Sequence, residues 1–208
     1  MIMDPKAPSI DLSYPFTGRW LVQNSPADRV PSHGTTMFAS AFAIDFVPVD
    51  ETGKSAPYTV ASFFRSEAPE TFPGFGRPVL APLDGTVVST VHSEIDHLAH
   101  RGLPSIGYAA SQRGRVAGGW MSAAGNHVLL ESGGIVVAVC HLQQGSISVR
   151  AGQRVGAGEV LGRCGNSGNS TEPHVHLQAM DGRDPQRAHP VPIAFDGVLP
   201  RNGTVLKM

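Results

Sequence analysis

Short apolar runs separated by turn residues dominate this chain from residue 19 onward. Several alternate apolar and polar positions, as in a strand with one buried face, and others are almost continuously apolar. The runs are RWLVQ (19–23), FAIDFVPV (42–49), YTVASFF (58–64), RPVLAPLDGTVVSTV (77–91), HVLLES (127–132), IVVAVCHL (135–142), SISVR (146–150), VLGRC (160–164) and HVHLQAM (174–180). The Gly133-Gly134 pair between two of them is a strong hairpin signal. The pattern predicts a mainly β fold with many tight turns.

Two long segments interrupt the strand pattern. Residues 50–76 are rich in Pro and Gly and predict at most one strand, and residues 93–122 are polar with a short helix predicted around 95–101. Long loops inside a compact domain are usually functional or mobile. We expect one domain over 1–208 in which these insertions are either walls beside a groove or surface decoration.

Composition narrows the possible partners. The formal net charge of the 208 residues is −1, which predicts no nucleic-acid footprint and no attraction to an anionic membrane. No apolar stretch approaches the ~20 residues of a membrane span. The first residues, MIMDPKAPSIDLSYPF, do not have the pattern of a signal peptide. The sequence is therefore compatible with a cytosolic protein or with a leader that precedes it, and the compartment and oligomeric state stay open.

Cys140 and Cys164 are too few for a disulfide framework and lack C-x-x-C spacing. We expect buried free thiols, with a single disulfide as the alternative. Because Cys140 directly precedes His141 in a strand-like run, alternation predicts that the two side chains face opposite ways.

The closing run places His174 and His176 two positions apart. Side chains two apart in a strand share one face, so both imidazoles and then Gln178 project together. This arrangement can aim two imidazoles at one metal ion or substrate. An isolated H-x-H is more often a pair of solvated histidines, so other residues must decide.

Two further side chains extend this set. Asp45 interrupts an apolar run, where a carboxylate is costly to bury unless it is paired or binds a metal, although alternation also allows it to face water. His141 ends another run at a rim-like position. One carboxylate and three imidazoles are sufficient for a zinc site with one or two acid–base groups. The sequence alone does not bring these strands together.

Residues 77–178 resemble the lysostaphin/LytM-like zinc metallopeptidases of peptidase family M23. The matching stretches are RPVLAPLDGTVV, GNHVLLESGG, VAVCHLQQGSISVRAGQRVGAGEVLGRCGNSGNSTEPHVHLQ and, more loosely, FAIDF. Their order along the chain makes the resemblance specific. It implies an antiparallel β-sheet groove of the LytM/lysostaphin, barrel-sandwich hybrid-like, type with long loop insertions.

The resemblance also implies roles for individual residues. Asp45 and His176 match the family's zinc ligands, and His141 and His174 match the histidines that assist catalysis. The implied cofactor is Zn²⁺, and the implied substrate is a peptide bond of bacterial cell-wall peptidoglycan. A peptide or peptidoglycan is then the expected partner.

One position departs from the family pattern. The first ligand of the H-x-x-x-D motif should lie four residues before Asp45, where this chain has Ala41. Three accounts stay open: His33 supplies the third ligand from upstream, the site binds zinc weakly with two ligands, or the domain is a degenerate, non-catalytic relative. In the last case it would bind a cell-wall component or regulate a partner enzyme.

A biotinyl- or lipoyl-type carrier is a further alternative, because APLDGTVV and VRAGQRVGAGEVLG are similar to the two halves of such a domain. The modified lysine should lie between those halves. The chain has no lysine between Asp84 and Gly152, so we set this alternative aside.

Overall fold

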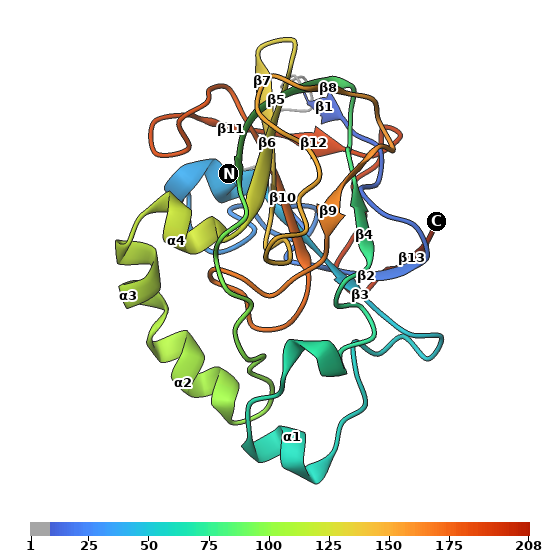
Figure 1. Cartoon of the computed structure of the whole chain (residues 1–208), viewed down its shortest axis with the longest axis vertical. Coiled ribbons are helices and arrows are strands. Elements are labelled where there is room, and N and C mark those ends of the chain that lie inside the picture. The colour runs from blue at the N-terminus through green and yellow to red at the C-terminus, as the bar shows by residue number, and fades with distance from the viewer. Residues whose placement is uncertain (1–8) are drawn as a thin grey trace.

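The computed structural model describes residues 9–208, apart from the side chains at positions 112, 113 and 115. Its centre is an antiparallel sheet of nine strands, which confirms the prediction of a mainly antiparallel β fold (Figure 1). Eight strands follow one another in the order β13 (Val205–Lys207), β2 (Arg19–Gln23), β3 (Ile44–Pro48), β10 (Val175–Met180), β7 (Ile135–Cys140), β6 (His127–Ser132), β5 (Gly85–Val91) and β8 (Arg154–Val155). The ninth, β11 (Pro190–Val191), pairs with β10.

Two pairs of short strands lie outside this sheet. β4 (Pro78–Leu80) pairs antiparallel with β9 (Val160–Arg163), and β1 (Ile10–Asp11) pairs parallel with β12 (Ile193–Ala194). Backbone hydrogen bonds from Ser13 to Pro82 and from Leu80 to Pro15 tie the first described residues to β4. Both pairs contribute apolar residues to the larger cluster that packs against one face of the large sheet.

The large sheet is buried on both faces. Val175 and Leu177 of β10 point into the larger apolar cluster, which the β4–β9 pair and the segments near both chain ends complete. Met180 of β10 points into a second cluster, which also contains Ala39 and Trp120. Burial on both faces explains why the central runs read as almost continuously apolar.

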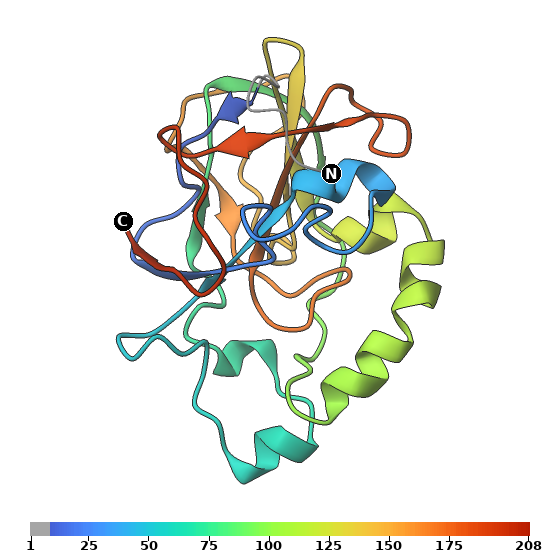
Figure 2. The ribbon, with the colours of Figure 1, turned by 180° about the vertical axis from the view of Figure 1, so that it is seen from behind.

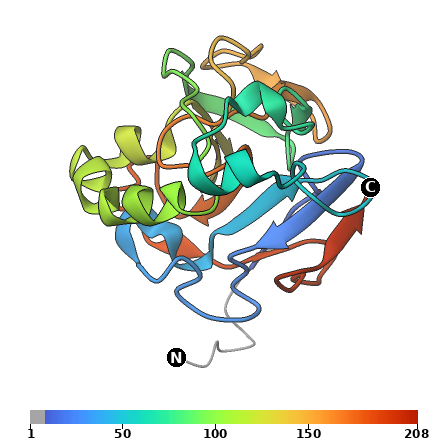
Figure 3. The same ribbon diagram turned by 90° about the horizontal axis from the view of Figure 1, so that it is seen from below.

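The helical elements lie mainly in the two insertions. They are η1 (Met37–Phe42), α1 (Val60–Phe64), η2 (Pro69–Thr71), α2 (Pro104–Ala110), α3 (Gln112–Ala117) and α4 (Trp120–Ala124). Helices α2, α3 and α4 follow one another along one flank, and α1 lies at the far end of the molecule from the β6–β7 turn (Figures 1 and 2). Seen from below, α1 and the α2–α4 flank lie on the same side of β2 and β3 (Figure 3). None of the helices in residues 9–208 is long and apolar enough to cross a membrane.

The two insertions pack against each other through a buried cation. Arg101 donates to both carboxylate oxygens of Glu67 at 2.8 Å and to the carbonyl oxygen of Ala56. Its guanidinium lies over the rings of Tyr58 and Phe72. A bidentate Arg–carboxylate pair with a buried guanidinium fixes the relative position of the segments it joins.

Three predicted elements are wrong. The run at 58–64 is helix α1, because Thr59 and Ser62 form a reciprocal capping box and the apolar side chains of this turn are exposed. Residues 95–101 contain no helix, and α2 instead begins at Pro104, whose fixed φ suits a first helical position. Residues 146–150 form no strand.

Candidate metal centre

Strand pairing places Asp45 beside His176. β3 and β10 are antiparallel neighbours, and these two residues stand directly opposite in their register. The Nδ1 atom of His176 lies 2.9 Å from Oδ1 of Asp45. The contact follows from the order of strands, because the residues are far apart in the sequence.

His33 reaches the other oxygen of the same carboxylate. Its Nε2 atom lies 3.0 Å from Oδ2 of Asp45. The loop that carries it is fixed by a backbone hydrogen bond from Ser32 N to Ala41 O at 3.0 Å. The Ser32 hydroxyl lies 2.9 Å from Nδ1 of His33 and restrains the ring. Ala41 has no ligand atom in its side chain, but its carbonyl group holds the loop that brings His33 to Asp45.

The residues His33, Asp45 and His176 form a cluster with metal-ligand chemistry. One donor atom from each lies within 4.8 Å of the other two. Two imidazoles and one carboxylate are a donor set that suits zinc, and three protein ligands leave a fourth position for water or substrate. The residues present therefore fit a zinc ion. We call them the metal-ligand cluster.

The surroundings of Asp45 favour its charged form. Burial alone would raise its pKa, but His33 and His174 nearby, together with hydrogen bonds from His176 and His33, hold that pKa well below its usual range. The Asn24 amide donates a further hydrogen bond to Oδ2 at 2.7 Å. A carboxylate that stays ionised at neutral pH is the form that binds a cation.

Gln178 orients the ring of His176. Its amide nitrogen donates to the carbonyl oxygen of Phe38 at 2.7 Å, so its Oε1 faces Nε2 of His176 at 3.0 Å. Both ring nitrogens thus face acceptors. Burial alone would lower the pKa of His176, but the hydrogen bond to Asp45 and its charge raise that pKa above the ordinary value. With Nδ1 directed to a metal, Nε2–H could still donate to Gln178, as outer-shell partners of metal-binding histidines do.

His141 enters the same pocket through an unusual backbone conformation. It follows the last residue of β7 and has a φ of 62°, in the left-handed region. Its Nδ1 lies 2.8 Å from the carbonyl oxygen of Ser167, which can only accept, so Nδ1 carries the proton and Nε2 is left for the pocket. Burial, with His174 and His176 nearby, holds the pKa of His141 well below its usual range. The ring is therefore neutral and can accept a proton.

The left-handed turn at His141 also corrects the prediction for Cys140. Both residues line the same pocket, so they do not face opposite ways. Alternation places Cys140 on the Ala138 face of β7, and the positive φ then turns His141 back toward that face. Cys140 and Cys164 are both free and buried, as predicted.

His174 is held in the same way as His141. Its Nδ1 lies 2.8 Å from the carbonyl oxygen of Glu172 and 2.9 Å from the Ser170 hydroxyl. Its Nε2 lies 3.8 Å from Oδ1 of Asp45. The rings of His141 and His174 have centroids 4.6 Å apart. The four histidines named from the sequence and Asp45 therefore meet in one place.

The second insertion fixes the loop that positions these histidines. Asp96 accepts a 2.7 Å hydrogen bond from the backbone N–H of Asn166, and Nε2 of His97 lies 2.9 Å from the carbonyl oxygen of Gly168. The Asn166 amide donates back to the carbonyl of His97 at 2.8 Å. His97, which belongs to the second insertion, is therefore bonded to this loop through both its ring and its backbone carbonyl. Burial raises the pKa of Asp96 despite the hydrogen bonds that its carboxylate accepts from the backbone N–H groups of Asn166 and Gln144.

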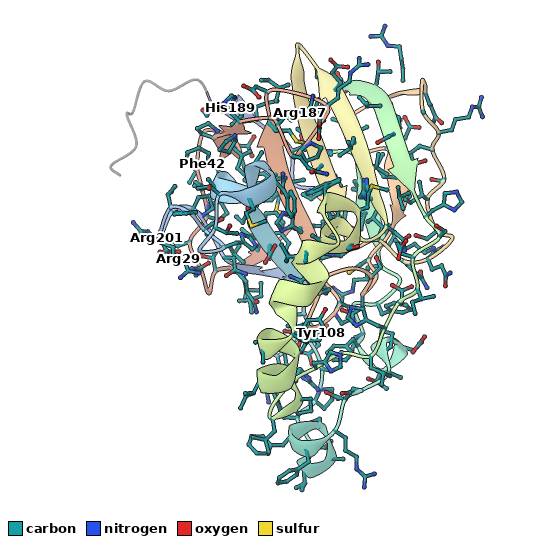
Figure 4. The ribbon with its side chains drawn as sticks, turned by 90° about the vertical axis from the view of Figure 1, so that its left-hand side faces the viewer. Arg29, Phe42, Tyr108, Arg187, His189 and Arg201 are labelled. Carbon is teal, nitrogen blue, oxygen red and sulfur yellow. The ribbon has the colours of Figure 1, made fainter. Side chains whose placement is uncertain are left out.

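The metal-ligand cluster lies at the polar floor of a pocket of about 300 Å³. Apolar residues of η1, α2, α3 and α4 form much of its walls, and η1 and α4 lie in front of the sheet in Figure 4, with Tyr108 on α2 below them. The indole N–H of Trp120, on this wall, is buried without an acceptor among the described residues. Such a donor normally has a partner. The wall is thus mainly apolar, next to the polar side chains of the metal-ligand cluster.

Sequence reasoning missed several residues that support the cluster. Gln178 was placed on the correct face by alternation but was given no role. Asn24 and Ser32 lie in loops, where no periodic pattern indicates which way a side chain points. Asn24 reaches Asp45 only because β2, which ends just before it, pairs with β3.

Comparisons with known proteins give a family match and several similar structures. Residues 90–188 match the sequence profile of Peptidase family M23. The chain is similar to the catalytic domain of an A109H mutant of the prophage-encoded M23 protein EnpA from Enterococcus faecalis, at 21% identity over 72% of this chain and 73% of that chain, with a TM-score of 0.41. It is also similar to the catalytic domain of lysostaphin from Staphylococcus simulans (17% identity, 87% and 88% of the two chains, TM-score 0.41) and to LytU (19%, 90% and 86%, 0.41). The matched segment contains His141, His174 and His176 and begins after His33 and Asp45.

Proposed function

We propose, from the premise that residues 90–188 of this chain belong to peptidase family M23, that the protein is a zinc-dependent metallo-endopeptidase acting on peptide bonds of bacterial cell-wall peptidoglycan. The observation that carries the proposal is the meeting of His33, Asp45 and His176, whose donor atoms lie within 4.8 Å of one another in a pocket. The same pocket holds two further histidines suited to proton transfer.

In this proposal His33, Asp45 and His176 hold the zinc ion, and His33 stands in for the ligand missing at Ala41. The low pKa of Asp45 and the hydrogen bond between His176 and Gln178 support these assignments. A bound zinc ion supplies Lewis acidity, which polarises a peptide carbonyl and makes water a competent nucleophile near neutral pH.

His141 and His174 would move and stabilise charge around the substrate. Each has Nδ1–H held by a backbone carbonyl, so each presents Nε2 to the pocket. The lowered pKa of His141 keeps its ring neutral, so the unprotonated Nε2 would take a proton from the attacking water and return it to the leaving amine. In its doubly protonated form His174 would donate from Nε2 to the developing oxyanion, and in its neutral form the same nitrogen would share the proton transfer.

Cell-wall peptides are proposed as substrates because of the family match and because of the solved relatives. Lysostaphin, one of the proteins with a similar structure, is an antimicrobial peptidase. A pocket with an ionic floor and apolar walls can hold a short peptide segment.

The test combines metal analysis with a digestion assay. We expect one zinc per purified chain and zinc-dependent release of new amino groups from peptidoglycan. His176→Ala should lose both, whereas His141→Gln should keep the zinc and lose the activity. His189→Ala, at an exposed histidine paired with Asp181, is the matched control.

Protein that binds no zinc after reconstitution would refute the proposal. Zinc-loaded protein that cleaves neither peptidoglycan nor its peptides would instead favour the non-catalytic alternative, in which the domain binds a cell-wall component or regulates an enzyme.

A further inference from the structure

We propose that Arg29 forms a carboxylate-binding subsite beside the metal-ligand cluster, so that the pocket selects peptides with a carboxylate close to the scissile bond. Only the position of this subsite relative to a bond that is cleaved rests on the proposed function. The subsite itself concerns binding, and it can be tested without turnover.

Arg29 belongs to the same loop as His33 and lines the same pocket. Its Nε–H donates to the carbonyl oxygen of Ser32 at 2.9 Å, directly before His33 in the chain. This bond fixes one edge of the planar guanidinium group. The two terminal nitrogens remain as paired donors, since they make no hydrogen bond to any side chain or backbone group that the structure describes.

The charge of Arg29 is not neutralised by its neighbour. Asp28 accepts from Arg201 at 3.0 Å and from the backbone N–H of Asn202 at 2.7 Å, so both of its oxygens are engaged. Figure 4 shows Arg29 and Arg201 on the same part of the surface, below η1. No described carboxylate lies within ion-pair distance of the Arg29 guanidinium.

No other permanently cationic side chain accompanies Arg29 among the described residues that line the pocket. Among the side chains that the structure describes, Arg29 is the only arginine or lysine on the pocket lining. The one carboxylate there, Asp45, already contacts Asn24, His33 and His176. Arg29 is therefore available to an incoming anion.

A guanidinium with two free parallel N–H groups matches a carboxylate in both charge and geometry. The carboxylate could be the free C-terminus of a peptide or an acidic side chain within it. Both present the same two oxygens, so the experiment has to separate these sources.

The test measures binding of three synthetic stem tetrapeptides by isothermal titration calorimetry. The first is the free acid, the second has only its C-terminus amidated, and the third has only its side-chain carboxylate amidated. Each is titrated into zinc-loaded and zinc-free protein, because a carboxylate can also coordinate zinc. We expect removal of one carboxylate to weaken binding about 10- to 100-fold, the effect of losing a hydrogen bond to a charged group.

Variants then assign the preference to Arg29. Arg29→Gln should bind all three peptides equally in the zinc-free protein, with its zinc content unchanged. Arg29→Lys should keep only part of the preference, since a lysine cannot form the bidentate contact. Arg187→Gln, an exposed arginine paired with Asp184, should behave like the unaltered protein.

The peptide whose amidation weakens binding identifies the source of the carboxylate. Equal binding of all three peptides to the unaltered protein, or an undiminished preference in Arg29→Gln, would overturn the inference. Absence of cleavage would count against the proposed function and leave this binding result standing.

Discussion

Replacing His33 with alanine separates the three accounts of the missing ligand. In the metal-free protein His33 makes one hydrogen bond to Asp45 and its side chain is 21% exposed, so its loss should cost about 1 kcal/mol of stability. Asn24 still donates to the same carboxylate oxygen. The metal-free variant should therefore fold.

The effect on zinc should be much larger. Loss of an outer-shell partner typically weakens metal binding 10- to 100-fold, so loss of one of three direct ligands should exceed ~100-fold. At a free zinc concentration 100 times the original Kd, the unaltered protein gains about 2.7 kcal/mol from binding, whereas a variant weakened 100-fold gains about 0.4 kcal/mol. Most of the zinc-dependent rise in Tm should disappear.

The assay is competition for zinc with a chromophoric chelator, combined with thermal unfolding with and without zinc. His189→Ala is the control, because this exposed histidine pairs only with Asp181 among the described residues. Unchanged zinc affinity in His33→Ala would refute the assignment and favour a site with two protein ligands. If His33→Ala and His189→Ala both failed to bind zinc, the control would itself be misfolded. A lowered Tm of metal-free His189→Ala would show this.

Three other predictions follow from buried groups. Zinc affinity should fall as pH decreases through the raised pKa of His176, because zinc needs the ring nitrogen that the proton then occupies; chelator competition from pH 5.5 to 8.5 measures this, and a flat profile would contradict it. Arg101→Ala should lower stability in urea unfolding by about 3 kcal/mol, because the partly buried Glu67 carboxylate is left without its partner, and a loss below ~1 kcal/mol would show that water replaces the pair. Burial raises the pKa of the Cys140 and Cys164 thiols, so neither should react with a disulfide reagent until the chain unfolds, and rapid labelling of native protein would contradict their burial.

The strands of the large sheet were predictable where a run had one consistent period. The runs at 19–23 and 127–132 coincide with β2 and β6 because alternation or continuous apolarity extends over their whole length. The run at 58–64 reads equally well as a strand, and only a local side-chain cap makes it a helix. Strands of two residues, such as β1 and β8, exist only because a partner strand lies beside them, so no local pattern could indicate them.

The residues of the candidate site were predictable in kind but not in arrangement. Alternation placed His174 and His176 on one side, and both line one pocket. The same rule failed for Cys140, because it holds only while the backbone stays extended and His141 has a positive φ. The position of His33 depends on a hydrogen bond to the backbone of Ala41, and the sequence does not show which carbonyl a loop will meet.

The register that sets Asp45 against His176 joins positions 131 residues apart. Contacts of such long range form only after much of the chain has collapsed, since their loop-closure entropy must be offset by other packing. No short segment of the unfolded chain therefore contains the three ligands together. Metal loading should accordingly be among the last events of folding, and bound zinc would serve as a reporter that β3 and β10 have paired in the correct register.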